Sequence, residues 1–182
     1  MGTTTSLLTV DQAREIADLR PDIRYELHQG ELIQLPPPKH KHRVIQEKLR
    51  HLLGLKAAKF GYAFVECGFR GTPEYNSRIA DVALLSKEHQ DQAVELDEVF
   101  GAPALIIEVL SPSNRAIEID EKEDFCLSHG CQSFWLVDPT RRTVKVTNAS
   151  HHVQWFKEGD TIDLAPFAAD TVSVNEIFAP LS

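Results

Sequence analysis

Carboxylates inside strand-like runs are the residues of this sequence best suited to chemistry. Glu108 lies near the end of an apolar run, residues 104–110, which is typical of a buried strand. Asp81 lies inside a second β-type run, residues 79–85. A buried carboxylate is costly unless it is paired, hydrogen-bonded or bound to a metal, and two on neighbouring strands suit a hard divalent cation. The pattern predicts a Mg²⁺ or Mn²⁺ site at Asp81 and Glu108.

Lys122 is the third candidate, in a helix that we expect from about Arg115 to Ser128. A lysine ammonium is a compact charge that could orient an attacking water or stabilise charge in a transition state. Two acids, a lysine and a cation are the parts that metal-assisted phosphodiester hydrolysis needs. A simpler interpretation stays open, because Glu118 lies four residues earlier and an i,i+4 ion pair would also explain Lys122.

Simpler interpretations also stay open for the other polar candidates. Asp81 could pair with Arg78, and Glu108 could be a hydrogen-bonded core acid. His40 and His42 could bind zinc, but no third ligand follows at a clear spacing. Phosphate contact or a place in the lining of a cleft is therefore the preferred interpretation for His42.

Composition limits the class of protein. With 182 residues, of which 42% are hydrophobic, the chain can form one domain over residues 1–182 with a sizeable core. No apolar run is long enough to cross a bilayer, and the first residues lack the pattern of a secretory signal, so we expect no membrane partner and a cytoplasmic location. Three cysteines without paired spacing are expected to be reduced thiols.

The charge balance bears on nucleic-acid binding in two ways. The formal net charge of −8 disfavours long-range attraction to phosphates. However, residues 39–59 are rich in lysine and arginine, and one region could still face a polyanion. Lys48, Arg50 and Lys56 are the candidate phosphate contacts, although a solvated helix face explains the same pattern equally well.

Periodicity and turn residues predict a chain of alternating elements. The expected strands cover residues 25–35 as a hairpin, then 62–69, 79–85, 104–110, 134–138, 143–147, 153–156 and 171–174. The expected helices cover residues 9–19, a basic segment from about residue 39, a short stretch within 86–98, and 115–128. Strands 62–69 and 79–85 should be antiparallel, and strands 104–110 and 134–138 should be joined by a parallel crossover. We therefore predict an α/β protein with a mixed sheet flanked by helices and an N-terminal β-hairpin.

Several blocks of this sequence, taken in order, resemble the Uma-type restriction endonuclease family, a branch of the PD-(D/E)XK nuclease superfamily. The blocks that carry the resemblance are Tyr25-Glu26-Leu27, Gly30-Glu31-Leu32, His42, Asp81-Val82, Ile107-Glu108-Val109-Leu110-Ser111-Pro112-Ser113, Glu121-Lys122, Gly130 and Phe134-Trp135-Leu136-Val137-Asp138-Pro139. The resemblance is strongest over residues 25–146. It implies a restriction-endonuclease-like core and Mg²⁺-dependent cleavage of DNA.

The resemblance also assigns roles to single residues. Asp81 matches the metal-binding aspartate and Glu108 the second acid. Leu110 stands where the superfamily usually has its lysine, and in this branch Lys122 of the following helix takes that role. Glu26 and His42 match polar positions, and the resemblance implies that they line the same cleft.

Two function classes follow from these patterns. The first is a metal-dependent endodeoxyribonuclease, which a homodimer would suit because a duplex has two strands to cut. The alternative is a catalytically inactive DNA- or protein-binding module that retains the nuclease fold.

Overall fold

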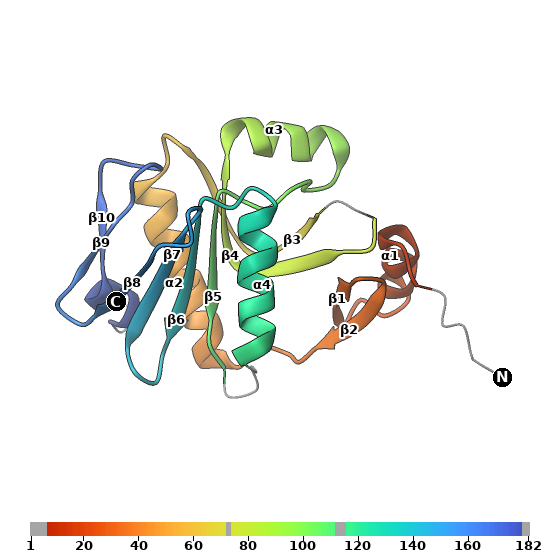
Figure 1. Cartoon of the computed structure of the whole chain (residues 1–182), viewed down its shortest axis with the longest axis horizontal. Coiled ribbons are helices and arrows are strands. Elements are labelled where there is room, and N and C mark those ends of the chain that lie inside the picture. Colours follow the sequence, from red (N-terminus) through yellow and green to blue (C-terminus); the bar gives the residue numbers. More distant parts are fainter. Residues whose placement is uncertain (1–6, 72–73, 112–115, 180–182) are drawn as a thin grey trace.

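A mixed β-sheet runs through the molecule, and helices cover both of its faces (Figure 1). The computed structural model describes residues 7–71, 74–111 and 116–179. The strands are β1 (Arg24–His28), β2 (Glu31–Leu35), β3 (Gly61–Arg70), β4 (Ser77–Ser86), β5 (Leu105–Val109), β6 (Ser133–Asp138), β7 (Thr143–Asn148) and β8 (Val153–Lys157). Their order is β2-β1-β4-β5-β6-β7-β8, and β3 pairs with β4. The predicted mixed sheet and its N-terminal hairpin are confirmed.

Strand direction follows the prediction. β3 and β4 pair in antiparallel fashion, whereas β5 and β6 pair in parallel through a crossover that contains α4 (Ala116–Ser128). The remaining helices are α1 (Val10–Asp18), α2 (His40–Lys56), α3 (Lys87–Leu96) and α5 (Val174–Phe178). A small sheet of β9 (Thr161–Asp163) and β10 (Thr171–Ser173) lies near α5. β9 and α5 are too short to have left a clear periodic pattern.

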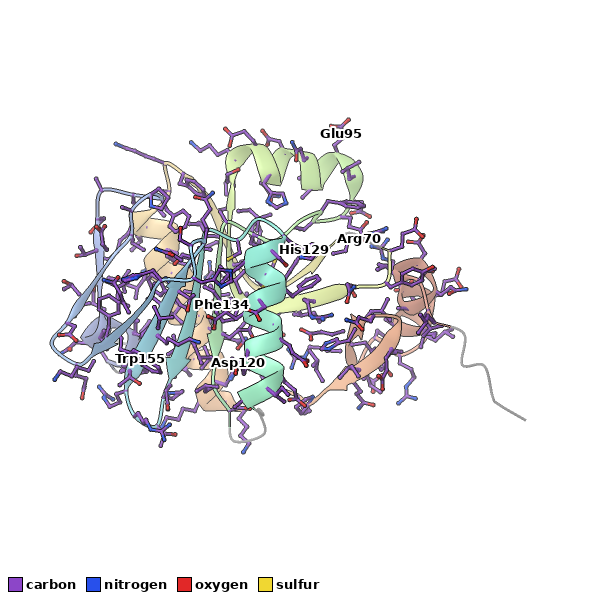
Figure 2. The ribbon with its side chains drawn as sticks, in the orientation of Figure 1. Arg70, Glu95, Asp120, His129, Phe134 and Trp155 are labelled. Carbon is purple, nitrogen blue, oxygen red and sulfur yellow. The ribbon has the colours of Figure 1, made fainter. Side chains whose placement is uncertain are left out.

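Two apolar layers hold the helices against the sheet. On one face, Ile45, Leu49 and Leu53 of α2 pack against strand residues that include Val82 and Ile107. On the other face, α4 packs against β4, β5 and β6, and Figure 2 marks Phe134 in this layer. Among the described helices, none has the length and apolar character needed to cross a membrane.

The regular alternation of β3 and β4 shifts at one position on each strand. Val82 packs in the α2 layer, but Ala80, two residues away, packs in the α4 layer. Val65 and Cys67 of β3 differ in the same way. Alternate residues of a regular strand face the same side, so both strands are locally distorted between these pairs.

Glu66 and Asp81 occupy the two distorted positions. The strand register pairs Val65 with Val82 and Cys67 with Ala80, so Glu66 and Asp81 lie opposite each other between those pairs. Glu66 has a φ of 51°, which a residue with a side chain rarely adopts. Local distortions of this kind are concentrated at functional sites, which makes these two carboxylates the centre of interest.

Candidate metal and nucleic-acid site

Asp81 and Glu108 lie together where the pairing of β4 with β5 ends, after Val82 and Ile107. The backbone N–H of Asp81 donates to Glu108 Oε1 at 3.3 Å. In return, the N–H of Val109 donates to Asp81 Oδ2 at 2.7 Å. These two hydrogen bonds replace strand pairing at this point. Each acid is therefore fixed by the backbone of the other acid's strand.

Lys122 of α4 is buried beside Glu108. Its ammonium donates to Glu108 Oε2 at 3.0 Å, to Glu26 Oε1 at 3.0 Å and to the Ile79 carbonyl at 2.7 Å. A lysine has three donors, and these contacts use all of them. The structure therefore turns Lys122 inward, toward acids on β1 and β5, rather than along the exposed side of α4.

Glu26 is also part of this buried group, since its side chain is only 5% exposed. Besides Lys122, it accepts hydrogen bonds from the backbone N–H of Ile79 at 2.9 Å and contacts His28 Nε2 at 2.8 Å. The geometry thus brings Glu26, Glu108 and Lys122 together, as the resemblance implied. Arg78, which the sequence offered as a possible partner of Asp81, donates to the Leu27 carbonyl.

Burial and ion pairing move the pKa values of this group in different directions. Burial raises the pKa of Glu108, although the Lys122 ammonium opposes the rise. Burial has the same effect on Glu26, but the Lys122 charge and the hydrogen bonds that Glu26 accepts lower its pKa to about 2. Burial would lower the pKa of Lys122, yet its two carboxylate partners raise that pKa well above the ordinary value. Lys122 therefore stays charged at physiological pH and cannot act as a general base.

A second group of side chains approaches Asp81 from α2 and β3. His42 Nε2 lies 3.1 Å from Asp81 Oδ1, and Gln46 Nε2 donates to the same oxygen at 3.0 Å. Gln46 also donates to Glu66 Oε1 at 2.5 Å. One ligand atom from each of His42, Glu66 and Asp81 lies within 4.8 Å of the other two.

This second group fits a divalent cation by its donor chemistry. Two carboxylates and an imidazole are ligands that Mn²⁺ accepts, and carboxylates alone are preferred by Mg²⁺. Within the described residues, Glu108 is not a member of this three-ligand set. Asp81 is therefore the residue common to both groups, with Glu108 on one side and His42 and Glu66 on the other.

The three basic residues of α2 that we predicted to contact phosphates have partners within the protein. Lys48 donates to the Ala179 carbonyl, and Arg50 Nε lies 2.8 Å from a Glu47 oxygen. Lys56 lies 3.5 Å from Glu176 Oε1. Their role in nucleic-acid binding stays a prediction.

Sequence reasoning missed Glu66 and Gln46. Glu66 is a carboxylate within an apolar strand, as Asp81 is, so the rule that selected Asp81 would also have selected Glu66. Gln46 follows Ile45 on the buried side of α2 and is 2% exposed. A polar residue at a core position of an amphipathic helix is a signal of the same kind.

The family model of Uma2, described as "Putative restriction endonuclease", matches residues 10–175. The chain belongs to the Uma2 family. The match includes the residues of both groups around Asp81, and it extends beyond residues 25–146 at both ends.

One solved structure has the same fold as this Uma2 chain. It is a protein from Anabaena variabilis whose description reads "putative nuclease belonging to DUF820". The two share 24% sequence identity with a TM-score of 0.81, over 94% of this chain and 97% of the other. No curated protein is similar enough in sequence to be counted as a relative.

Proposed function

We propose that this protein is a divalent-metal-dependent DNA endonuclease in which Asp81 and Glu108 hold Mg²⁺ or Mn²⁺ and Lys122 assists. The observation that carries the proposal is the meeting of these three side chains where β4 and β5 stop pairing. Membership in the Uma2 family supports the class of reaction. The fold and the family description do not depend on the roles of these residues, so the roles require their own test.

His42 and Glu66 are the additional donors in this proposal. They come from α2 and β3, whereas Lys122 comes from α4, and their distances allow a shared cation. A divalent cation held there would supply the Lewis acidity and positive charge that phosphodiester hydrolysis requires. Because one donor is an imidazole, Mn²⁺ is the better first probe.

Lys122 contributes a fixed positive charge. Its ammonium is held by two carboxylates and a carbonyl, so it need not reorganise when negative charge grows on a nearby phosphate. The raised pKa keeps it protonated throughout. Its proposed part is therefore electrostatic stabilisation and orientation of water, with proton removal left to other groups.

DNA is the proposed substrate, and a homodimer with one site for each strand is part of the proposal. A single domain and a cytoplasmic location also stay predictions. The second candidate function is a non-catalytic module that binds DNA or protein. The net charge of −8 and the use of all three Lys122 donors inside the protein favour this alternative.

Cleavage of supercoiled and single-stranded DNA with Mn²⁺ tests the proposal, with the Asp81→Asn protein assayed beside the wild type. We expect cleavage by the wild type only, because Asp81 belongs to both groups of side chains. Equal activity in Asp81→Asn would reveal a contaminating nuclease. No activity of the wild type on either substrate would favour the binding module.

A further inference from the structure

A cavity of about 430 Å³ lies between the β1–β2 hairpin, the beginning of α2 and β3. One part of its wall is apolar, formed by Ile23, Leu35, Pro37, Pro38 and Val65. The other part is polar and includes Arg24, Arg43, Gln46, Glu47 and Glu66. Its volume is within the range of roughly 300–1,000 Å³ in which proteins enclose small organic groups.

The cavity borders the candidate metal site. Gln46 and Glu66 belong to its wall, and Gln46 hydrogen-bonds Asp81 Oδ1 at 3.0 Å as well as Glu66. A group bound in the cavity would therefore lie one side chain away from Asp81. If a phosphodiester bond is cleaved at Asp81, the cavity is where a nucleotide next to that bond would lie.

The two arginines in the wall of the cavity differ in whether they already have partners within the protein. Arg24 donates to Glu66 and to the Pro36 carbonyl, so it is already part of the protein's own network. Arg43 is exposed and forms no ion pair with another residue in the part of the chain that the structure describes. Glu47, the acid nearest to it in the sequence, pairs with Arg50. Arg43 is therefore available to an anion from outside.

We propose that this cavity holds an unpaired nucleotide next to the cleaved bond, with Arg43 on its phosphate and its base against the apolar wall formed by Leu35 and Val65. This inference rests on the proposed function. In a duplex the bases are stacked and paired inside the helix, and moving one into a protein pocket requires it to leave the stack. A single strand or an already unpaired nucleotide avoids that cost, so the substrate class is DNA with unpaired nucleotides.

Binding without divalent metal tests the inference independently of catalysis. The probes are fluorescently labelled DNAs of one sequence: a single strand, a blunt duplex, and a duplex with one unpaired nucleotide. We expect the first and third to bind more tightly than the blunt duplex. Arg43→Ala should weaken binding of those two probes by about tenfold, the worth of one charge-assisted hydrogen bond.

Two further variants make the test specific. Arg141→Ala removes an 80% exposed arginine from the turn between β6 and β7 and should leave affinity unchanged, because it lies outside the cavity. Leu35→Trp fills the cavity and should abolish the preference for unpaired nucleotides while the thermal unfolding midpoint stays near that of the wild type. The new tryptophan could itself stack on a base and so preserve the preference. The inference is therefore overturned when Leu35→Trp keeps the preference for unpaired nucleotides and Arg43→Ala also binds the probes as tightly as the wild type.

Equal affinity for the blunt duplex and the single strand would also overturn it, as would equal losses in Arg43→Ala and Arg141→Ala. If the probes bind as expected but no metal-dependent cleavage is seen, the result supports the nucleotide cavity and counts only against the proposed catalysis. The two proposals can therefore fail separately.

Discussion

A buried ion-pair group is formed by Lys122, Glu26 and Glu108, and the charge of each member affects the stability of the others. One ammonium between two carboxylates is favourable only while all the partners are present, because an isolated buried charge is costly. The residue pattern identified Glu108 and Lys122, and the resemblance to a family added Glu26. The sequence could not show that Glu26 is buried, because alternation in a hairpin predicts a solvent-facing position as readily.

Replacement of Lys122 should separate chemistry from binding. We expect Lys122→Ala to lower metal-dependent DNA cleavage by about 100-fold or more, as loss of a preorganised charge does, with little change in the Kd for DNA. Lys122→Gln is the matched control, since its amide can keep hydrogen bonds to Glu26 and Glu108 without the charge. Wild-type cleavage rates in Lys122→Gln would show that the lysine has only a structural role.

Glu26 should affect how stability depends on pH. Its folded pKa of about 2 lies below the ordinary 4.5, so ionised Glu26 stabilises the fold above that ordinary value. This stabilisation is lost as the pH falls from about 4.5 through about 2, and it amounts to at most about 3 kcal/mol. Urea unfolding at pH 6 and pH 3 should show a smaller pH difference for Glu26→Gln than for the wild type. Identical pH differences in the two proteins would contradict this assignment.

At the scale of elements, the distortion shared by β3 and β4 is what places Glu66 and Asp81. Residue periodicity predicted both strands and their antiparallel pairing, because their apolar residues suit a buried sheet. It could not predict the shift in alternation, since period-2 reasoning assumes a regular strand throughout. The rule that selected Asp81 could have selected Glu66 as a candidate, but its place opposite Asp81 and its positive φ are visible only in the structure.

The backbone of Glu66 can be tested apart from its carboxylate. Glu66→Gly and Glu66→Ala both remove the carboxylate and its contacts with Arg24 and Gln46, so the pair differs mainly at the backbone. At a φ of 51°, glycine is the better residue, and we expect Glu66→Gly to be more stable than Glu66→Ala by about 1 kcal/mol in urea unfolding. Equal stability of the two variants would mean that the backbone relaxes there without cost.

At the scale of the whole molecule, residues from β1, α2, β3, β4, β5 and α4 converge around Asp81. The order of elements along the chain predicted one half of this convergence, because β4 and β5 were expected to be neighbours and α4 follows β5. The other half, to which α2 contributes, could not be predicted from the order of the elements. α2 is distant in sequence from β4. The resemblance placed His42 in the same cleft, but nothing in the pattern of α2 states that His42 and Gln46 contact Asp81 itself.

Metal binding should stabilise the whole fold and show which donors hold the ion. Mn²⁺ at about 100 times its Kd should add about 2.7 kcal/mol by mass action, which for a chain of this size raises the Tm by roughly 5–10 °C. Asp81→Asn should lose this rise, since Asp81 belongs to both groups, and the proposal requires that Glu108→Gln lose it too. His42→Ala tests the opposite side, where the loss of one nitrogen donor should reduce the rise seen with Mn²⁺ more than that seen with Mg²⁺. A full Mn²⁺ shift in Glu108→Gln together with none in His42→Ala would place the ion among His42, Glu66 and Asp81, and would leave Glu108 as the partner of Lys122 alone.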